Sequence, residues 1–200
     1  NFIDLSIDLG ANYVGSHLGI LSYEDNKKRN KILSERVIKN WHIIANYAEK
    51  KKLKSLIWEP MSISREFGET LNECKKIQSL LNKKKPSNFK ICLDVGHGDI
   101  NSKNKNNFDP YIWLKSFIKE SPVVHIKQVH KGSFGHHPFT RKNNVKGIIE
   151  AKKVLNIIKK YKNDETELAF ELSFKERDPI DKNMRNDVID SVKYWKKYIN

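Results

Sequence analysis

The sequence of 200 residues has few cysteines and no long apolar run. Its two cysteines, Cys74 and Cys92, are too far apart to form the close pairs that bind zinc or iron–sulfur clusters. We therefore expect reduced, buried thiols and a cytoplasmic setting. No stretch approaches the ~18 consecutive apolar residues that a membrane-spanning helix needs, so no membrane partner is predicted.

The sequence also lacks an interdomain linker and a dinucleotide-binding motif. No segment is rich in proline or serine, and no strand-like run is followed by the glycine fingerprint that cradles a pyrophosphate. We therefore expect a single domain over residues 1–200 that does not bind a dinucleotide.

Negative charge is scarce relative to positive charge. With 38 Lys and Arg against 24 Asp and Glu, the formal net charge is +14. A nucleic-acid or phosphate partner would explain this excess, and so would a bias toward Lys, Asn and Ile across the whole chain. The lysines are spread over every predicted helix, which favours compositional bias, and we expect no nucleic-acid partner.

Short apolar runs alternate with longer amphipathic runs along the chain. The apolar runs predict five strands, near residues 11–17, 54–58, 89–93, 122–126 and 168–170. The amphipathic runs predict helices, near residues 29–52, 70–82, 109–120, 146–161 and 184–199. Asp109-Pro110 is a typical helix start, with Asp at the N-cap and Pro at the first helical position.

Strands that alternate with helices of this length predict parallel pairing through right-handed crossovers. The fold class expected is α/β, of the TIM (β/α)₈-barrel type. A complete barrel usually needs roughly 250 residues, and this chain has 200, beginning at Asn1 without a methionine. We therefore expect the C-terminal portion of a barrel, with about five βα units and its N-terminal part absent.

Ionisable side chains stand where four of the predicted strands end. These side chains belong to Glu59, Asp94, His125 and Glu171. In a parallel barrel they converge on the face that carries active sites. For a single residue, a solvated strand end is the ordinary explanation. Three carboxylates and an imidazole buried together are costly without a cation, and these ligand types suit Mn²⁺, Mg²⁺, Co²⁺ or Zn²⁺.

The strand-end motifs resemble those of the xylose-isomerase-like superfamily, which contains sugar and sugar-phosphate isomerases and epimerases and also apurinic-site endonucleases. The motifs are Gly15-Ser16-His17, Trp58-Glu59-Pro60-Met61, Leu93-Asp94-Val95-Gly96-His97, His125-Ile126-Lys127-Gln128 and Phe170-Glu171. Residues 59–66 and the loop segment 136–140 are similar to a subgroup that acts on tetrulose phosphates.

The resemblance implies a role for each strand-end residue. Glu59, Asp94, His125 and Glu171 match the four ligands of a single divalent metal. His97 matches a histidine that contacts substrate. Gln128 stands where the family often has an acidic residue, which leaves its role open.

Epimerisation of a ketose requires removal of a proton next to a carbonyl and its return on the opposite face of the resulting enediolate. Glu59 and Glu171 are the expected catalytic pair, because they end distant strands and a positioned carboxylate can accept or donate the proton. Candidate substrate-binding residues are His17, His97, Arg65, Gln128, His137 and Arg177. Each of these assignments competes with a role that involves no substrate. His17 could be a buried histidine at a strand end, and His137 an exposed histidine in a loop. The two arginines could be ordinary surface residues.

Two other functions compete with a sugar isomerase or epimerase. An apurinic-site endonuclease of this superfamily uses three metals and an Asp-x-His pair after the His125-type strand, and the segment Gly135-His136-His137 has no such aspartate. A non-catalytic barrel that binds sugar is the third candidate, although intact carboxylates at the strand ends argue against it. The expected partner is a small sugar or sugar phosphate, and association into a homo-oligomer is left open.

Overall fold

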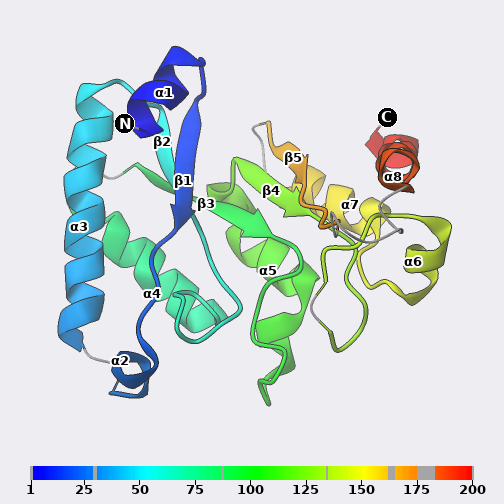
Figure 1. Ribbon diagram of the computed structural model, residues 1–200, viewed down its shortest axis with the longest axis horizontal. Helices are drawn as coiled ribbons and strands as arrows, with labels where there is room; N and C mark the ends of the chain where they lie inside the picture. The colour runs from blue at the N-terminus through cyan, green and yellow to red at the C-terminus, as the bar shows by residue number, and fades with distance from the viewer. Residues whose placement is uncertain are drawn as a thin grey trace. The chain divides into compact units, whose positions relative to one another are not determined.

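The computed structural model describes residues 2–28, 31–86, 88–133, 135–161, 165–174 and 183–199, without the side chains of residues 31 and 32. The chain divides into two compact units, Asn1–Cys92 and Leu93–Asn200, which are described separately here (Figure 1). The single domain predicted over residues 1–200 stays a prediction.

The first unit is built on parallel strands with helices between them. Its elements are α1 (Phe2–Asp8), β1 (Tyr13–His17), α2 (Tyr23–Lys28), α3 (Lys31–Lys50), β2 (Ser55–Glu59), α4 (Leu71–Leu81) and the first residues of β3 (Phe89–Asp94). β1 pairs with β2 so that His17 stands opposite Glu59. β2 pairs with β3 from Leu56 opposite Phe89 to Trp58 opposite Ile91.

A buried glutamine ties α4 to the strands of this unit. The Trp58 indole N–H donates to Gln78 Oε1 at 2.7 Å, and the Gln78 amide donates to the Phe89 carbonyl at 2.9 Å. Trp58 is fully buried, so its N–H needs such a partner. The helix begins as predicted, because the Thr70 side chain accepts a hydrogen bond from the Glu73 N–H.

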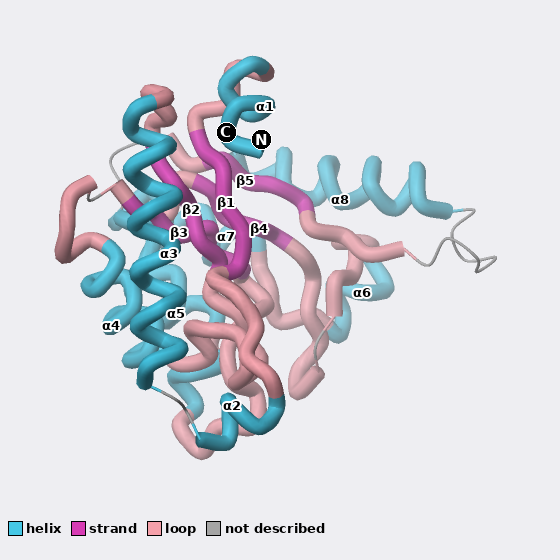
Figure 2. The backbone as a smooth tube through the Cα atoms, turned by 60° about the vertical axis from the view of Figure 1, so that its left-hand side comes forward, coloured by secondary structure: helices cyan, strands magenta, loops and turns pink. Residues whose placement is uncertain are grey.

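The second unit continues the alternation. Its elements after β3 are η1 (Lys105–Phe108), α5 (Pro110–Phe117), η2 (Ile118–Glu120), β4 (Val123–Ile126), α6 (Arg141–Lys146), α7 (Ala151–Tyr161), β5 (Glu167–Phe170) and α8 (Met184–Ile199). β4 and β5 are parallel, α7 packs against α5 and α8, and the sheet order is β1-β2-β3-β4-β5. Figure 2 distinguishes the strands, in magenta, from the helices, in cyan.

Local signals explain most of these boundaries. The Asp109 side chain accepts from the N–H groups of Tyr111 and Ile112, which confirms the predicted N-cap of α5. The prediction of one helix over 146–161 was wrong at its start, because residues 147–150 are not helical and α7 begins at Ala151. There the Ile148 N–H donates to the Val129 carbonyl instead. α1 was not predicted at all.

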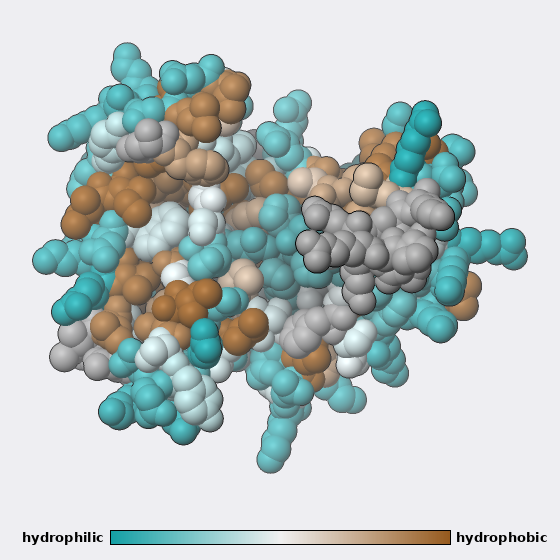
Figure 3. Space-filling view, in the orientation of Figure 1, coloured by the Kyte–Doolittle hydropathy of each residue, from teal (hydrophilic) through white to brown (hydrophobic). Residues whose placement is uncertain are grey.

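The described residues contain no membrane-spanning helix but expose an apolar patch. None of their helices is long and apolar enough to cross a membrane. Apolar surface gathers over α1 on the face seen in Figure 3, where Phe2, Leu5 and Leu9 are 69%, 52% and 75% exposed.

The loop after β4 is held by the side chain of Gln128. Its amide group donates to Asn144 Oδ1 and to the Ile149 carbonyl, at 2.9 and 3.0 Å. Its amide oxygen accepts from the N–H groups of Val129 and Ile149. A Cβ atom at Gly147 would lie 2.0 Å from Gln128 Cδ. The glycine therefore lets the loop close over a glutamine whose hydrogen-bonding capacity is fully used.

Replacing Gly15 by alanine should destabilise the protein strongly. An alanine Cβ would lie 1.6 Å from the Ile57 carbonyl oxygen on β2, so the strand pair must separate, at a cost of about 1–3 kcal/mol or more. Urea unfolding measures the loss. The neighbouring Ser16→Ala variant is the control and should stay within ~0.5 kcal/mol of the parent. Equal stability of the two variants would contradict the close approach of β1 and β2.

Gln128→Leu should also destabilise, because it leaves the buried N–H groups of Val129 and Ile149 without their acceptor. Each lost partner costs about 1–3 kcal/mol, and thermal unfolding measures the sum. Lys131→Ala, at an exposed position of the same loop, is the control. A Gln128→Leu protein that melts like this control would show that the loop does not depend on the glutamine.

Candidate metal centre

Asp94 is the most deeply buried acidic side chain of the centre. It ends β3 and is 2% exposed. The Gly96 N–H donates to its Oδ1 at 2.6 Å, which fixes the carboxylate plane. Its Oδ2 is buried and receives no hydrogen bond of good geometry from the described residues. A buried carboxylate oxygen in this state is suited to bind a cation.

Two further side chains converge on Asp94. One ligand atom from each of Asp94, His97 and Glu171 lies within 4.8 Å of the others, close enough to hold one metal ion. His97 Nε2 is 3.6 Å from Asp94 Oδ2. Glu171 directly follows β5, and its N–H donates to the Ile126 carbonyl of β4. The convergence therefore follows from parallel strands that end at the same edge.

His125 lies beside the same carboxylates. It belongs to β4, and its Nδ1 is 3.7 Å from Glu171 Oε2. His136 Nδ1, from the loop after β4, is 3.5 Å from the same oxygen. The sequence singled out His125 as a ligand and His97 as a substrate contact. The structure brings both imidazoles close to the carboxylates.

Lys127 was missed by the sequence analysis. It is 2% exposed, and its Nζ lies 2.6 Å from Asp94 Oδ2 and 2.9 Å from Glu171 Oε2. A usable signal was present, since Lys127 follows His125 by two residues and side chains two apart on a strand point to the same face. A lysine on that face is directed at the same carboxylates.

The charges in the centre shift the pKa values of the two carboxyl groups in opposite directions. Burial acts to raise the pKa of the Asp94 carboxyl group. Three neighbours outweigh burial and hold this pKa below its usual value: His97 through its charge, Glu171 through a hydrogen bond, and Lys127 through both. Burial and the neighbouring Asp94 raise the pKa of Glu171, against the opposing effect of Lys127. The more buried group thus carries the more stable negative charge.

Glu59 and His17 lie in the first unit, at the ends of paired strands. Continued by one residue, the β2–β3 register places Glu59 opposite Cys92, two residues before Asp94. His17 Nδ1 is buried and has no hydrogen-bond partner among the described residues. Both residues therefore stand at the carboxyl ends of their strands, as the sequence predicted.

The remaining candidates for substrate contact differ in position. Arg65 is exposed in a loop of the first unit. His137 stacks on His130, with ring centroids 4.3 Å apart, and burial, His130 and His136 lower its pKa. The fully used amide of Gln128 favours a structural role for that residue over the expected substrate contact. Arg177 lies outside the described residues.

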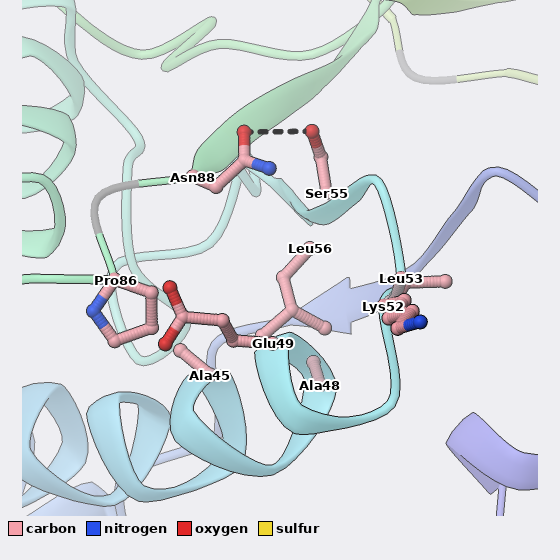
Figure 4. Close-up of a pocket in the computed structure, with 9 residues that line it drawn as sticks. All are labelled: Ala45, Ala48, Glu49, Lys52, Leu53, Ser55, Leu56, Pro86 and Asn88. Atoms are coloured by element: carbon pink, nitrogen blue, oxygen red, sulfur yellow. Dashed lines mark hydrogen bonds between the residues drawn. The ribbon is translucent and has the colours of Figure 1, made fainter.

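A cavity of about 260 Å³ lies elsewhere, at the amino-terminal end of β2 in the first unit. Figure 4 shows Leu56 and Ala45 beside it, with the Glu49 carboxylate directed toward Pro86. Ser55 Oγ donates to Asn88 Oδ1 at its edge. Its lining mixes apolar and polar residues and contains one carboxylate, so this cavity does not supply the ligand set of a metal.

The described residues contain no disulfide, and both cysteines are buried, which confirms the predicted buried thiols. Cys74 belongs to α4 and Cys92 to β3. Neither belongs to the cluster of Asp94, His97 and Glu171.

The chain resembles known proteins in sequence and in fold. The chain is 38% identical over 205 residues to D-erythrulose 1-phosphate 3-epimerase of Brucella abortus (strain 2308), covering 100% of the chain and 65% of that protein. The chain therefore spans about two thirds of the length of that relative.

Solved structures show the same fold. A putative xylose isomerase from Rhodospirillum rubrum superposes with a TM-score of 0.86 at 20% identity, over 100% of this chain and 66% of the other. An L-ribulose 3-epimerase superposes with a TM-score of 0.64 at 16% identity, over 98% and 63%. At these identities the likeness concerns the fold, which is the predicted TIM-barrel type.

The family model described as xylose isomerase-like TIM barrel matches residues 1–198. The match covers nearly the whole chain, including every strand that carries a candidate ligand. The chain belongs to the xylose isomerase-like TIM barrel family.

Proposed function

We propose that the protein carrying this chain isomerises or epimerises a small ketose or ketose phosphate with the help of one divalent metal ion. The observation that supports this most strongly is the cluster of Asp94, His97 and Glu171 at the carboxyl ends of parallel strands. The similarity to an epimerase of D-erythrulose 1-phosphate favours a sugar phosphate as substrate.

The donor set fits a divalent metal. Asp94 and Glu171 offer carboxylate oxygens, and the buried Oδ2 of Asp94 already faces one cation, the Lys127 ammonium at 2.6 Å. With His125 and Glu59 they would make a four-ligand site of the kind Mn²⁺, Mg²⁺, Co²⁺ and Zn²⁺ accept. The bound ion would act as a Lewis acid toward the substrate carbonyl.

The protein's own side chains supply the proton transfers in this proposal. One of Glu59 and Glu171 accepts the proton from the carbon next to the carbonyl, and the other donates a proton to the opposite face of the enediolate. Configuration at that carbon then inverts, with no net change in atoms or charge. His97, beside Asp94, is the proposed contact for a substrate hydroxyl.

Imidazole and guanidinium groups are the proposed binding partners of an anionic substrate. His17 and the loop residue His137 are candidates for contacts with the sugar, and Arg65 and Arg177 for contacts with a phosphate, which arginine binds well.

Reduced buried cysteines fit the cytoplasmic setting that we propose. The proposed partner is a small molecule and not a nucleic acid, and self-association into a homo-oligomer is compatible with this function.

Glu59→Gln and Glu171→Gln should each reduce epimerase turnover by at least ~10²-fold, the lower end for general acid–base catalysis. Glutamine keeps the size but cannot take up a proton. Each variant should retain part of the exchange of the substrate α-proton with solvent deuterium, because one face keeps its base. NMR in D₂O with a panel of ketoses and ketose phosphates measures turnover and exchange together.

The matched control is Glu150→Gln, an exposed glutamate paired with Lys153, which should leave turnover unchanged. Removing metal with a chelator should abolish turnover, and adding Mn²⁺, Mg²⁺, Co²⁺ or Zn²⁺ should restore it. Cleavage of abasic DNA with a steep salt dependence, and no ketose exchange, would replace this proposal by the endonuclease. Neither activity across the panel would favour a sugar-binding protein.

A further inference from the structure

A lysine ammonium group occupies the centre of the carboxylate cluster. Lys127 Nζ contacts Asp94 Oδ2 at 2.6 Å and Glu171 Oε2 at 2.9 Å. The Asp94 atom is the same buried oxygen that receives no hydrogen bond of good geometry. The lysine therefore donates a hydrogen bond to Glu171 Oε2 and is held at Asp94 Oδ2 by charge, at the oxygens that a metal ion would use.

The chain makes room for this lysine. A Cβ atom at Gly96 would lie 2.6 Å from Lys127 Cε and 2.7 Å from Val129 Cγ2, so the lysine stem passes directly over a glycine. The same glycine N–H orients Asp94 by binding its Oδ1. Two contacts therefore fix the position of the ammonium group. The lysine side chain packs against Gly96, and the Asp94 carboxylate that it contacts is oriented by the Gly96 N–H.

A metal ion and this ammonium cannot use the same oxygens at once. Metal–carboxylate bonds are about 2.0–2.2 Å long, and two cations that close together repel each other strongly in a site shielded from water. Entry of a metal therefore requires the ammonium to leave Asp94 Oδ2 and Glu171 Oε2. In return, without metal the ammonium compensates two carboxylates that would otherwise repel each other.

Other acceptors lie within reach of the displaced ammonium. His97 Nε2 is 3.4 Å from Lys127 Nζ, and the ring nitrogens of His136 are 3.2 Å from it. A small rotation of the lysine side chain would keep it hydrogen bonded on the side of these imidazoles. The lysine can therefore give up the carboxylates without becoming a buried charge that lacks all partners.

We propose that Lys127 is the internal counter-cation of the metal site: it holds Asp94 and Glu171 together before metal binds, competes with the metal for their oxygens and so sets the metal affinity. The proposal rests on the metal site put forward above. It gives Lys127 opposite effects on two measurable quantities, the stability of the metal-free protein and the affinity for metal.

Lys127→Met tests the proposal, because methionine keeps an unbranched apolar stem and removes the charge. Metal-free Lys127→Met should melt at least ~5 °C below the parent, since the buried Asp94 carboxylate and its neighbour Glu171 lose their counter-ion. It should bind Mn²⁺ at least ~10-fold more tightly, an effect on the scale of changes to residues around metal ligands. Calorimetric titration with MnCl₂ and thermal melts in chelator measure the two. Lys153→Met removes an exposed lysine and should change neither.

The outcomes separate the possibilities. A lower melting temperature with weaker Mn²⁺ binding would make Lys127 a structural support and overturn the proposal, as would unchanged Mn²⁺ affinity. Failure of both the parent and the variant to bind Mn²⁺ would overturn the metal site as well. If Lys127→Met does not fold, crystals of the parent with chelator and with Mn²⁺ decide. The Lys127–Asp94 contact should be present in the first and broken in the second, and a contact kept beside bound Mn²⁺ overturns the proposal.

Discussion

The carboxylates of Asp94 and Glu171 lie close together, the first buried and the second partly exposed, and a cation between them is the constraint on which the centre depends. In the structure Lys127 supplies that charge. The geometry around it is consistent with this dependence. Gly96 clears the path of the lysine and fixes the Asp94 carboxylate, and His97 and His136 surround the ammonium. A divalent ion in the same place would satisfy the same carboxylates more strongly.

The second unit builds this arrangement from ordinary elements. Parallel pairing of β4 with β5 brings His125 and Glu171 to one edge, and Val95, just after β3, donates to the His125 carbonyl. The loop after β4 then returns over the strand ends because Gln128 binds Asn144 and Ile149. The buried lysine and the buried glutamine are neighbours in sequence with separate tasks, one electrostatic and one structural.

Much of this could be predicted from the sequence, because the relevant signals are local. Thr70 and Asp109 cap helices as their residue types predict, and apolar runs that end in Glu, Asp or His mark the strand ends. The parts that could not be predicted depend on contacts distant in sequence. Gln128 was expected to contact substrate. Its amide instead binds Asn144 and Ile149, and nothing near Gln128 in the chain reveals these contacts. Lys127 was one of many lysines, and its burial depends on the space above Gly96.

The proposed mechanism and the competition with Lys127 both require that Asp94 and Glu171 bind one divalent metal ion. Anomalous X-ray scattering from crystals of the protein grown with Mn²⁺ tests it most directly. We expect a single strong anomalous peak about 2.0–2.6 Å from a carboxylate oxygen of each residue, the range for such ions. A map without a peak at these carboxylates, at Mn²⁺ concentrations that support turnover, would contradict it.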